Sequence, residues 1–149
     1  MSDINVKIKI LKNGTQIPEY ATQGSAAVDL RSAAEADVVI EPGERALIPT
    51  GIAIAPDRKD VVAILAARSG LSVKHGITLT NGIGVIDSDY RGEIAVSLCN
   101  VSDKPYTVVK GERIAQLMFM PVLQANFIPA EELDETDRGV GGFGSTGKI

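Results

Sequence analysis

The feature that most restricts the fold of this chain is a two-residue alternation of apolar and polar side chains in many short runs. Val6, Ile8 and Ile10 alternate with lysines near the N-terminus, which is the pattern of a half-buried strand. Residues 61–65 are apolar on both faces, so we expect a strand in the middle of a sheet. The other short runs that we expect to be strands are residues 38–40, 46–48, 52–54, 94–99, 107–109 and 114–120.

Turn-forming residues separate these runs. The turn signals are Asn13-Gly14, Pro42-Gly43, Pro56-Asp57, Asn81-Gly82, Arg91-Gly92 and Lys110-Gly111. Asn81-Gly82 is a pair that favours a β-hairpin. No long segment has a helical period, and the one helical turn that we expect lies around residues 71–74, before Gly76. Many short strands with such turns predict an all-β sandwich or barrel.

The composition changes after Pro129. Residues 131–137 hold five acids, and residues 138–149 hold five glycines. Such a segment cannot bury enough apolar surface to order itself. The 149 residues therefore predict one β domain over residues 1–129, followed by a flexible arm over residues 130–149.

The composition also excludes several classes of function. Cys99 and His75 are the single cysteine and histidine, so they cannot build a zinc site, and zinc-dependent nucleobase deaminases are excluded. The net charge of -4 and the absence of tryptophan argue against a nucleic-acid partner. No apolar run approaches ~20 residues, so we expect no membrane partner. The first eleven residues lack the apolar core of a signal peptide, which favours a cytoplasmic location.

Two segments concentrate residues that can carry chemistry. Arg68, Ser69 and Gly70 combine a cation, a hydroxyl and close backbone access, which suits a phosphate, although this tripeptide is also common in surface turns. Asp87 and Asp89 follow the hairpin signal, and we expect them on the same side of an extended strand. Two acids near an arginine are also typical of a solvated turn, so both interpretations stay open.

The arm contains two strings that match nucleotide-binding loops, at residues 139–144 and 142–148. Both kinds of loop hold a phosphate at the N-terminus of a following helix, and we expect no helix after Ile149. Ile149 also stands where a magnesium-binding hydroxyl is needed, so we reject both matches. Glycine backbone with Arg138 and the hydroxyls that follow it can still wrap an anion, although a tail without a role stays open.

Five segments in order carry a family resemblance. They are residues 25–30 (SAAVDL), 68–72 (RSGLS), 84–94 (GVIDSDYRGEI), 111–117 (GERIAQL) and 138–147 (RGVGGFGSTG). The series resembles the five motifs of the homotrimeric dUTPases, the deoxyuridine triphosphate nucleotidohydrolases, and the third motif is the most specific. Ala27, Ala67 and Ser72 depart from the residues that are usual in the family, but they remove no functional group.

This resemblance implies a jelly-roll-like β-sandwich or barrel subunit in a homotrimer with active sites at the subunit interfaces. Motifs one, two and four would come from one subunit, motif three from a neighbour and the arm from the third, closing as a lid. The implied reaction is hydrolysis of dUTP to dUMP and pyrophosphate. It limits the incorporation of uracil into DNA and supplies dUMP for thymidylate synthesis.

The same resemblance assigns roles to residues. Asp87 would be the catalytic carboxylate that orients and deprotonates a water for in-line attack on the α-phosphorus. Magnesium (Mg2+) would be held mainly by the triphosphate, with Asp29 contacting it through water. The residues expected to bind substrate are Arg68, Ser69, Gly70, Asn81, Val85, Ile86, Tyr90, Gln116, Arg138, Phe143, Gly144, Ser145 and Thr146.

Within that set, backbone groups between Asn81 and Tyr90 would pair with uracil, and Tyr90 would pack under the deoxyribose. Phe143 would stack on the base. The phosphates would be contacted by Arg68, Ser69 and Gln116, and the γ-phosphate would be closed over by Arg138, Ser145 and Thr146.

Two other functions were weighed. A dCTP deaminase shares the fold and much of the third motif, but it needs a general-base Glu where this sequence has Ser97. A non-enzymatic trimer that binds a nucleotide or a protein would be favoured by loss of Asp87, Tyr90 or Arg138, and all three are present. The sequence therefore favours the hydrolase, and it does not exclude an additional protein partner.

Overall fold

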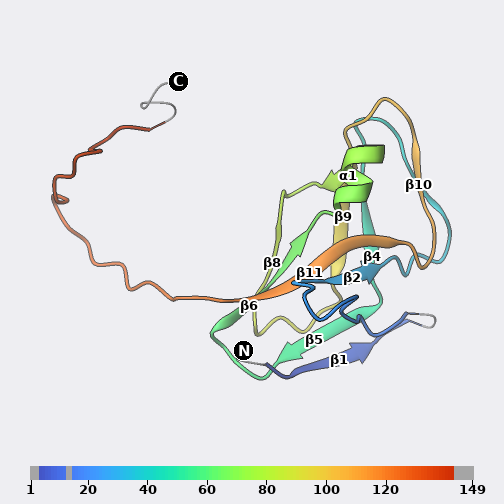
Figure 1. The fold of residues 1–149 in the computed structure, drawn as a ribbon, viewed down its shortest axis with the longest axis horizontal. Coiled ribbons are helices and arrows are strands. Elements are labelled where there is room, and N and C mark those ends of the chain that lie inside the picture. The colour runs from blue at the N-terminus through green and yellow to red at the C-terminus, as the bar shows by residue number, and fades with distance from the viewer. Residues whose placement is uncertain (1–3, 13–14, 143–149) are drawn as a thin grey trace.

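Within residues 4–12 and 15–142, which the computed structural model describes, the chain forms short strands and one short helix, as predicted (Figure 1). The helix is α1 (Ser69–His75). The strands are β1 (Val6–Ile10), β2 (Val28–Arg31), β3 (Val38–Ile40), β4 (Arg45–Pro49), β5 (Ile52–Pro56), β6 (Val61–Ala66), β7 (Ile77–Leu79), β8 (Gly84–Ile86), β9 (Ala95–Asn100), β10 (Tyr106–Val108) and β11 (Arg113–Pro121).

Two sheets and two ribbons make up the body of the protein. The larger sheet has the order β2-β11-β6-β8, the smaller one has the order β4-β9-β7, and β1 pairs with β5 and β10 with β3. All of these pairings are antiparallel. Alternate residues of the strands are buried between the sheets, and the core includes Ile48, Val96 and Ala115 with no measurable exposure. The arrangement is the expected jelly-roll-like β-sandwich.

The predicted strands all occur, and β6 lies between β11 and β8 in the middle of its sheet. The predicted helical turn is α1, which ends at Gly76 with a φ of 67°. A Cβ on Gly76 would lie 2.8 Å from the Cβ of Ser102, so both the conformation and the space require glycine there. No helix in residues 4–12 and 15–142 is long and apolar enough to cross a membrane.

Three strands were missed, namely β2, β7 and β8. Each contains only three or four residues, so an alternation gives a weak signal for them, and of the strands this short only β3 and β10 were predicted. The hairpin predicted at Asn81-Gly82 is wrong. That turn joins β7 to β8, but β7 pairs with β9 and β8 pairs with β6, so the chain passes from one sheet to the other. Burial of side chains from both strands in the shared core outweighs the local preference for a hairpin.

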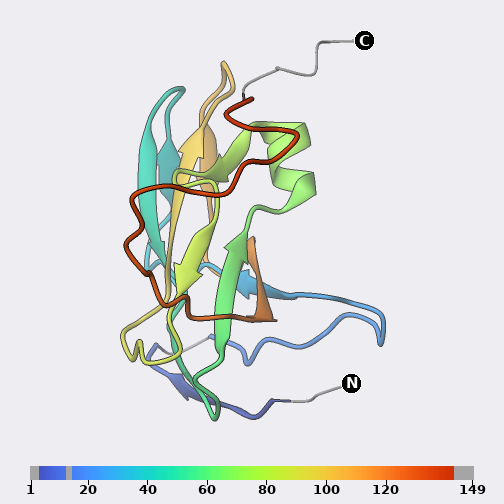
Figure 2. The ribbon, with the colours of Figure 1, turned by 90° about the vertical axis from the view of Figure 1, so that its left-hand side faces the viewer.

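The chain leaves the body after β11. Residues 122–142 contain no strand or helix, and they extend away from the body in Figure 1 and lie in front of the strands in Figure 2. Leu123, Phe127 and Ile128 in this segment are 100%, 91% and 79% exposed. The boundary between domain and arm at residues 129 and 130 stays a prediction.

The buried side chain of Asn100, on β9, links β3 and the loop after β9 by hydrogen bonds. Asn100 has no exposed surface, and its Nδ2 donates to the carbonyl oxygens of Ile40 at 2.9 Å and Lys104 at 2.7 Å. Its Oδ1 accepts from the backbone N–H and the hydroxyl of Ser102. The whole hydrogen-bonding capacity of the amide is therefore used between β9, β3 and the loop after β9.

Replacing Asn100 with Ala should lower the free energy of unfolding by about 3 kcal/mol, because buried carbonyl and N–H groups lose their partners. Urea denaturation at one fixed protein concentration measures this change. Asn5→Ala is the matched control, since Asn5 makes an exposed side-chain bond to Asp57, and it should change the stability by less than about 0.5 kcal/mol. Equal effects of the two substitutions would show that the Asn100 network is not a structural support.

Candidate active site

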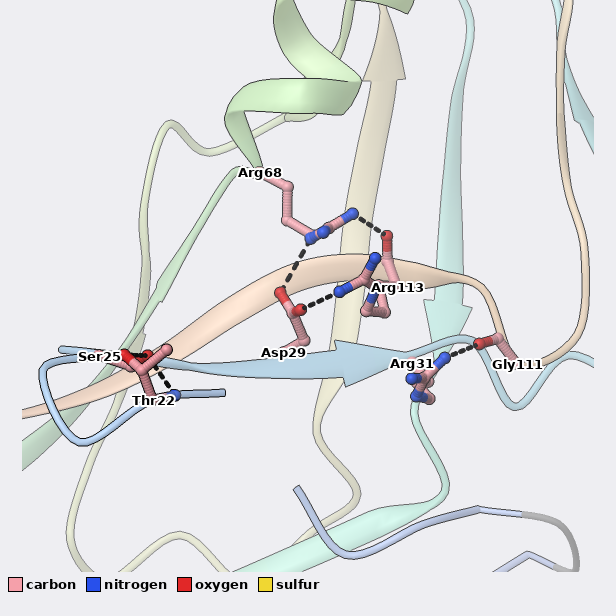
Figure 3. Close-up of polar contacts among 7 residues, drawn as sticks. All are labelled: Thr22, Ser25, Asp29, Arg31, Arg68, Gly111 and Arg113. Carbon is pink, nitrogen blue, oxygen red and sulfur yellow. Dashed lines mark hydrogen bonds and ion pairs between the residues drawn. The ribbon is translucent and has the colours of Figure 1, made fainter. Parts of the chain in front are cut away.

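Asp29, on β2, lies between two arginines (Figure 3). Nε of Arg68 donates to Oδ1 of Asp29 at 2.8 Å, and Nη1 of Arg113 donates to Oδ2 at 3.1 Å. Nη1 of Arg68 also donates to the backbone oxygen of Arg113 at 3.1 Å. The Asp29 side chain and that of Arg68 are each 23% exposed. One carboxylate thus orients two cations that are distant in the sequence.

Arg113 reaches this cluster because of a β-bulge in β11. The register of β11 against β2 shifts between Arg113 and Ala115. As a result Ile114 and Ala115 are both buried, although they are consecutive, while Arg113 is exposed. A bulge redirects a side chain in this way. Sequence reasoning missed the role of Arg113, and the break in alternation at Ile114-Ala115 was the signal that could have found it.

Gln116 completes this first cluster. It is the direct cross-strand partner of Asp29 on one side and of Ala66 on the other. Cross-strand partners point to the same face of a sheet, so the Gln116 amide and the Asp29 carboxylate share the outer face. Ser69 and Gly70 follow Arg68 in the exposed first turn of α1. Four of the predicted substrate-binding residues therefore gather around the predicted acid, Asp29.

A further hydrogen-bonded group joins β10 to the residues just before β11. The hydroxyl of Tyr106 donates to Oε1 of Glu112, and Oε2 of Glu112 accepts the backbone N–H of Val109 at 3.0 Å. Burial, together with this bond to Glu112, raises the pKa of Tyr106 to about 12, so its hydroxyl stays protonated at neutral pH. The ring of His75 packs against that of Tyr106, with 5.0 Å between the ring centroids, which fits a packing role for the single histidine.

Five of the other predicted residues line a separate cavity of about 280 Å³ beside β8. Ile86 points into the core with 9% exposure, while Val85 is 60% exposed. In the part of the chain that the structure describes, β8 pairs only with β6, so its other edge presents backbone N–H and C=O groups. The predicted residues in this lining are Asn81, Val85, Ile86, Asp87 and Tyr90.

Asp87 opens a tight turn directly after β8. The N–H of Tyr90 donates to the carbonyl oxygen of Asp87 at 3.1 Å, and the side chains of Asp87 and Asp89 are exposed. The prediction that these two acids lie on the same side of an extended strand is wrong, because the chain turns after Ile86. The turn instead places Asp87 and Tyr90 on the wall of one cavity.

Two neighbours fix the Tyr90 ring, and neither was assigned a role from the sequence. The Tyr90 hydroxyl donates to the backbone oxygen of Glu93 at 3.1 Å. A Cβ on Gly92 would lie 2.3 Å from the Tyr90 hydroxyl oxygen, so the absence of a side chain there lets the ring fold over the backbone. Oε1 of Glu93 accepts the N–H of Gly51 at 2.9 Å, which ties this segment to the turn between β4 and β5.

The register of the larger sheet separates the two clusters. Asp29, Gln116 and Ala66 form one row across β2, β11 and β6, whereas Ile86 pairs with Ala63, three residues farther along β6. Three strand spacings across the sheet and about four residues along it place Asp87 about 20 Å from Asp29. Within one chain, the two clusters are therefore separate.

Arg138, in the described part of the arm, lies in neither cluster. Nε of Arg138 donates to the carbonyl oxygen of Gly141 at 3.0 Å, within the arm itself. Phe143, Gly144, Ser145 and Thr146, which were predicted to bind substrate, lie outside the described residues.

Asp29 suits a water-mediated contact with a metal ion better than direct ligation. Its two oxygens each accept a bond from an arginine, and a carboxylate has about two further lone-pair positions for water. Within residues 4–12 and 15–142, no three His, Cys, Asp or Glu side chains group as they would to hold a metal ion. The donor set therefore fits an ion that takes most of its ligands from a phosphate substrate.

Known proteins resemble this chain over most of its length. The family model for dUTPase matches residues 13–147. The chain is 50% identical over 149 residues to a deoxyuridine 5'-triphosphate nucleotidohydrolase of Desulfitobacterium hafniense, covering 99% of each chain. It is 51% identical over 150 residues to the enzyme of that name from Glaesserella parasuis, again covering 99% of each.

Solved structures show the same fold. A dUTPase of Staphylococcus bacteriophage 80alpha with dUPNHPP superposes with a TM-score of 0.86 at 29% identity, covering 96% of this chain and 98% of the other. A family match over most of the chain, half-identical relatives of equal length and this shared fold lead to one conclusion: the chain belongs to the dUTPase family, the deoxyuridine 5'-triphosphate nucleotidohydrolases.

Proposed function

We propose that this dUTPase cleaves dUTP to dUMP and pyrophosphate by attack of water on the α-phosphorus, at sites shared between subunits. The observation that carries the proposal is the division of the chemistry into two clusters. One cluster gathers cations and the Gln116 amide around Asp29, which suits a triphosphate, and the other joins a cavity of about 280 Å³ to the carboxylate of Asp87. Neither cluster can bind and cleave a nucleotide by itself.

Asp29 and Asp87 lie about 20 Å apart within one chain, and a homotrimer would bring Asp87 of one subunit next to Asp29 of another. A general base must lie within hydrogen-bond reach of the attacking water, so Asp87 of one subunit must meet the Arg68 cluster of another. Apolar side chains on the outer face of the larger sheet favour such an assembly, since Met118, Ile64 and Val85 form a row across it. The exposed Leu123 and Phe127 of the extended segment also need a partner surface to cover them.

The cavity beside β8 would hold the nucleoside. Backbone groups at the open edge of β8 offer donors and acceptors to the uracil edge, and cytosine would leave those groups unpaired. Tyr90 forms one wall, where it would pack against the deoxyribose and reject a 2′-hydroxyl by contact. Asn81 lines the same cavity from the turn after β7.

Asp87 would then orient the water for in-line attack and accept its proton. The bond that forms joins the water oxygen to the α-phosphorus, and the bond that breaks releases pyrophosphate. Arg68, Ser69 and Gln116 would hold the phosphates, with Arg68 already oriented by Asp29. Arg138 and residues 143–146 of the arm would close over the γ-phosphate and the base, with Phe143 stacking on uracil.

Mg2+ bound to the triphosphate would supply charge neutralisation at the phosphate oxygens, with Asp29 as its protein contact through water. The local cations Arg68 and Arg113 explain how a protein with a net charge of -4 can bind a polyanion.

The proposal predicts one substrate and one position of attack. Incubation with dUTP, dCTP, dTTP, UTP and dATP in 18O-labelled water with magnesium should consume dUTP alone, and mass spectrometry should find the label in dUMP. Label in pyrophosphate would move the attack to the β-phosphorus. Release of ammonia from dCTP would indicate a deaminase, and no turnover at all would favour a binding protein.

Asp87→Asn should keep nucleotide binding and lower kcat by about 100- to 10,000-fold, because the amide cannot accept the proton of the water. Steady-state kinetics and equilibrium binding of dUTP measure the two effects. Asp89→Asn is the matched control, since Asp89 is an exposed acid of the same turn, and it should stay close to wild type. Near-normal turnover of Asp87→Asn would remove Asp87 as the base.

A further inference from the structure

The guanidinium group of Arg91 donates hydrogen bonds to backbone carbonyl oxygens. Its Nη1 donates to two backbone oxygens of the Asp87–Tyr90 turn, that of Ser88 at 2.8 Å and that of Tyr90 at 2.9 Å. Among the residues that the structure describes, Arg91 forms no ion pair. Its polar contacts are therefore with the backbone of the turn.

The other contacts that hold this turn are few. The backbone closes it with one bond, from the N–H of Tyr90 to the oxygen of Asp87 at 3.1 Å. The hydroxyl of Ser88 reaches the backbone oxygen of Lys59 at 3.3 Å, near the long limit for such a bond. Without Arg91, the turn would keep these two contacts and the bond from the Tyr90 hydroxyl to the backbone oxygen of Glu93.

The surroundings of Arg91 favour this orientation. The side chain borders a hollow of about 290 Å³ against the β1-β5 ribbon, where Lys7 and Lys9 are its cationic neighbours. Arg91 also lines a second cavity together with Asp57, Asp87 and Asp89, and attraction to these carboxylates and to the carbonyl oxygens favours the position of the guanidinium against the turn. A guanidinium suits the task, since a single nitrogen carries two donors that can serve two carbonyl groups at once.

We propose that Arg91 is a positioning residue that clamps the Asp87–Tyr90 turn and thereby sets the catalytic carboxylate and the sugar-facing ring as one unit. This inference rests on the proposed function of Asp87 and Tyr90. Arg91 acts on the backbone between these residues, so it controls turnover and sugar selectivity together. A small displacement of a catalytic group is sufficient to lower a rate substantially.

The test compares Arg91→Met, Arg91→Lys and Arg58→Met with the wild-type protein. Met keeps the apolar stem but removes every donor, whereas Lys retains donors on one nitrogen. Arg58 is the matched control, because its guanidinium pairs with Asp60 and forms no hydrogen bond to the turn. The readouts are kcat and KM for dUTP and UTP, the midpoint of thermal unfolding, and amide hydrogen exchange at residues 87–92.

Arg91→Met should lower kcat for dUTP about 10- to 100-fold and reduce the preference for dUTP over UTP. Hydrogen exchange at the Tyr90 amide should become faster, and the thermal midpoint should stay within about 2 °C of wild type. Arg91→Lys should recover part of both kinetic effects, and Arg58→Met should match wild type.

Unchanged kcat and unchanged sugar preference in Arg91→Met would contradict the proposal that Arg91 positions the turn. So would an equal loss for dUTP and UTP accompanied by a lower thermal midpoint, since that result indicates general destabilisation. Failure of the proposed function is recognised separately, because the wild-type protein and Arg58→Met would then also fail to hydrolyse dUTP.

Discussion

The register of the four-stranded sheet β2-β11-β6-β8 is the constraint on which the rest of this structure depends. It aligns Asp29, Gln116 and Ala66 in one row and displaces Ile86, and with it Asp87, to a different level of the far strand. A shift of one residue would turn each of these side chains to the other face. The sheet therefore fixes both the composition of each cluster and the distance between them within one chain.

Within the first cluster, the Asp29 carboxylate pairs with Arg68 and Arg113 and orients both side chains, and the three groups together keep a net positive charge. This preorganisation lowers the cost of ordering long cationic side chains around phosphates. In the second cluster, backbone groups take the place that the cationic side chains have in the first. The open edge of β8, the turn at Asp87 and the missing side chain of Gly92 form a cavity that suits a neutral base and a sugar. The proposed function assigns the phosphates to the first cluster and the base and sugar to the second.

Much of this arrangement was predictable from the sequence. Alternation located the strands of five or more residues, and motif order located Asp29, Arg68, Asp87 and Gln116. Three or four residues display a period only weakly, so of the shortest strands β3 and β10 were predicted, whereas β2, β7 and β8 were missed. The hairpin at Asn81-Gly82 was wrong because strand pairing is decided by burial across the whole core. The role of Arg113 depends on a bulge, and those of Gly92 and Arg91 depend on contacts that local patterns do not encode.

The central claim is that Arg68 and Asp87 act together only across a subunit boundary. The most direct test is to prepare mixed oligomers of Arg68→Met and Asp87→Asn, each inactive alone, and to measure dUTP hydrolysis. In a cyclic trimer with random mixing, about one quarter of the sites would combine both intact residues, so the mixture should regain about a quarter of wild-type activity. Activity of the mixture no greater than the average of the two variants would contradict the account and place both residues in one subunit's site.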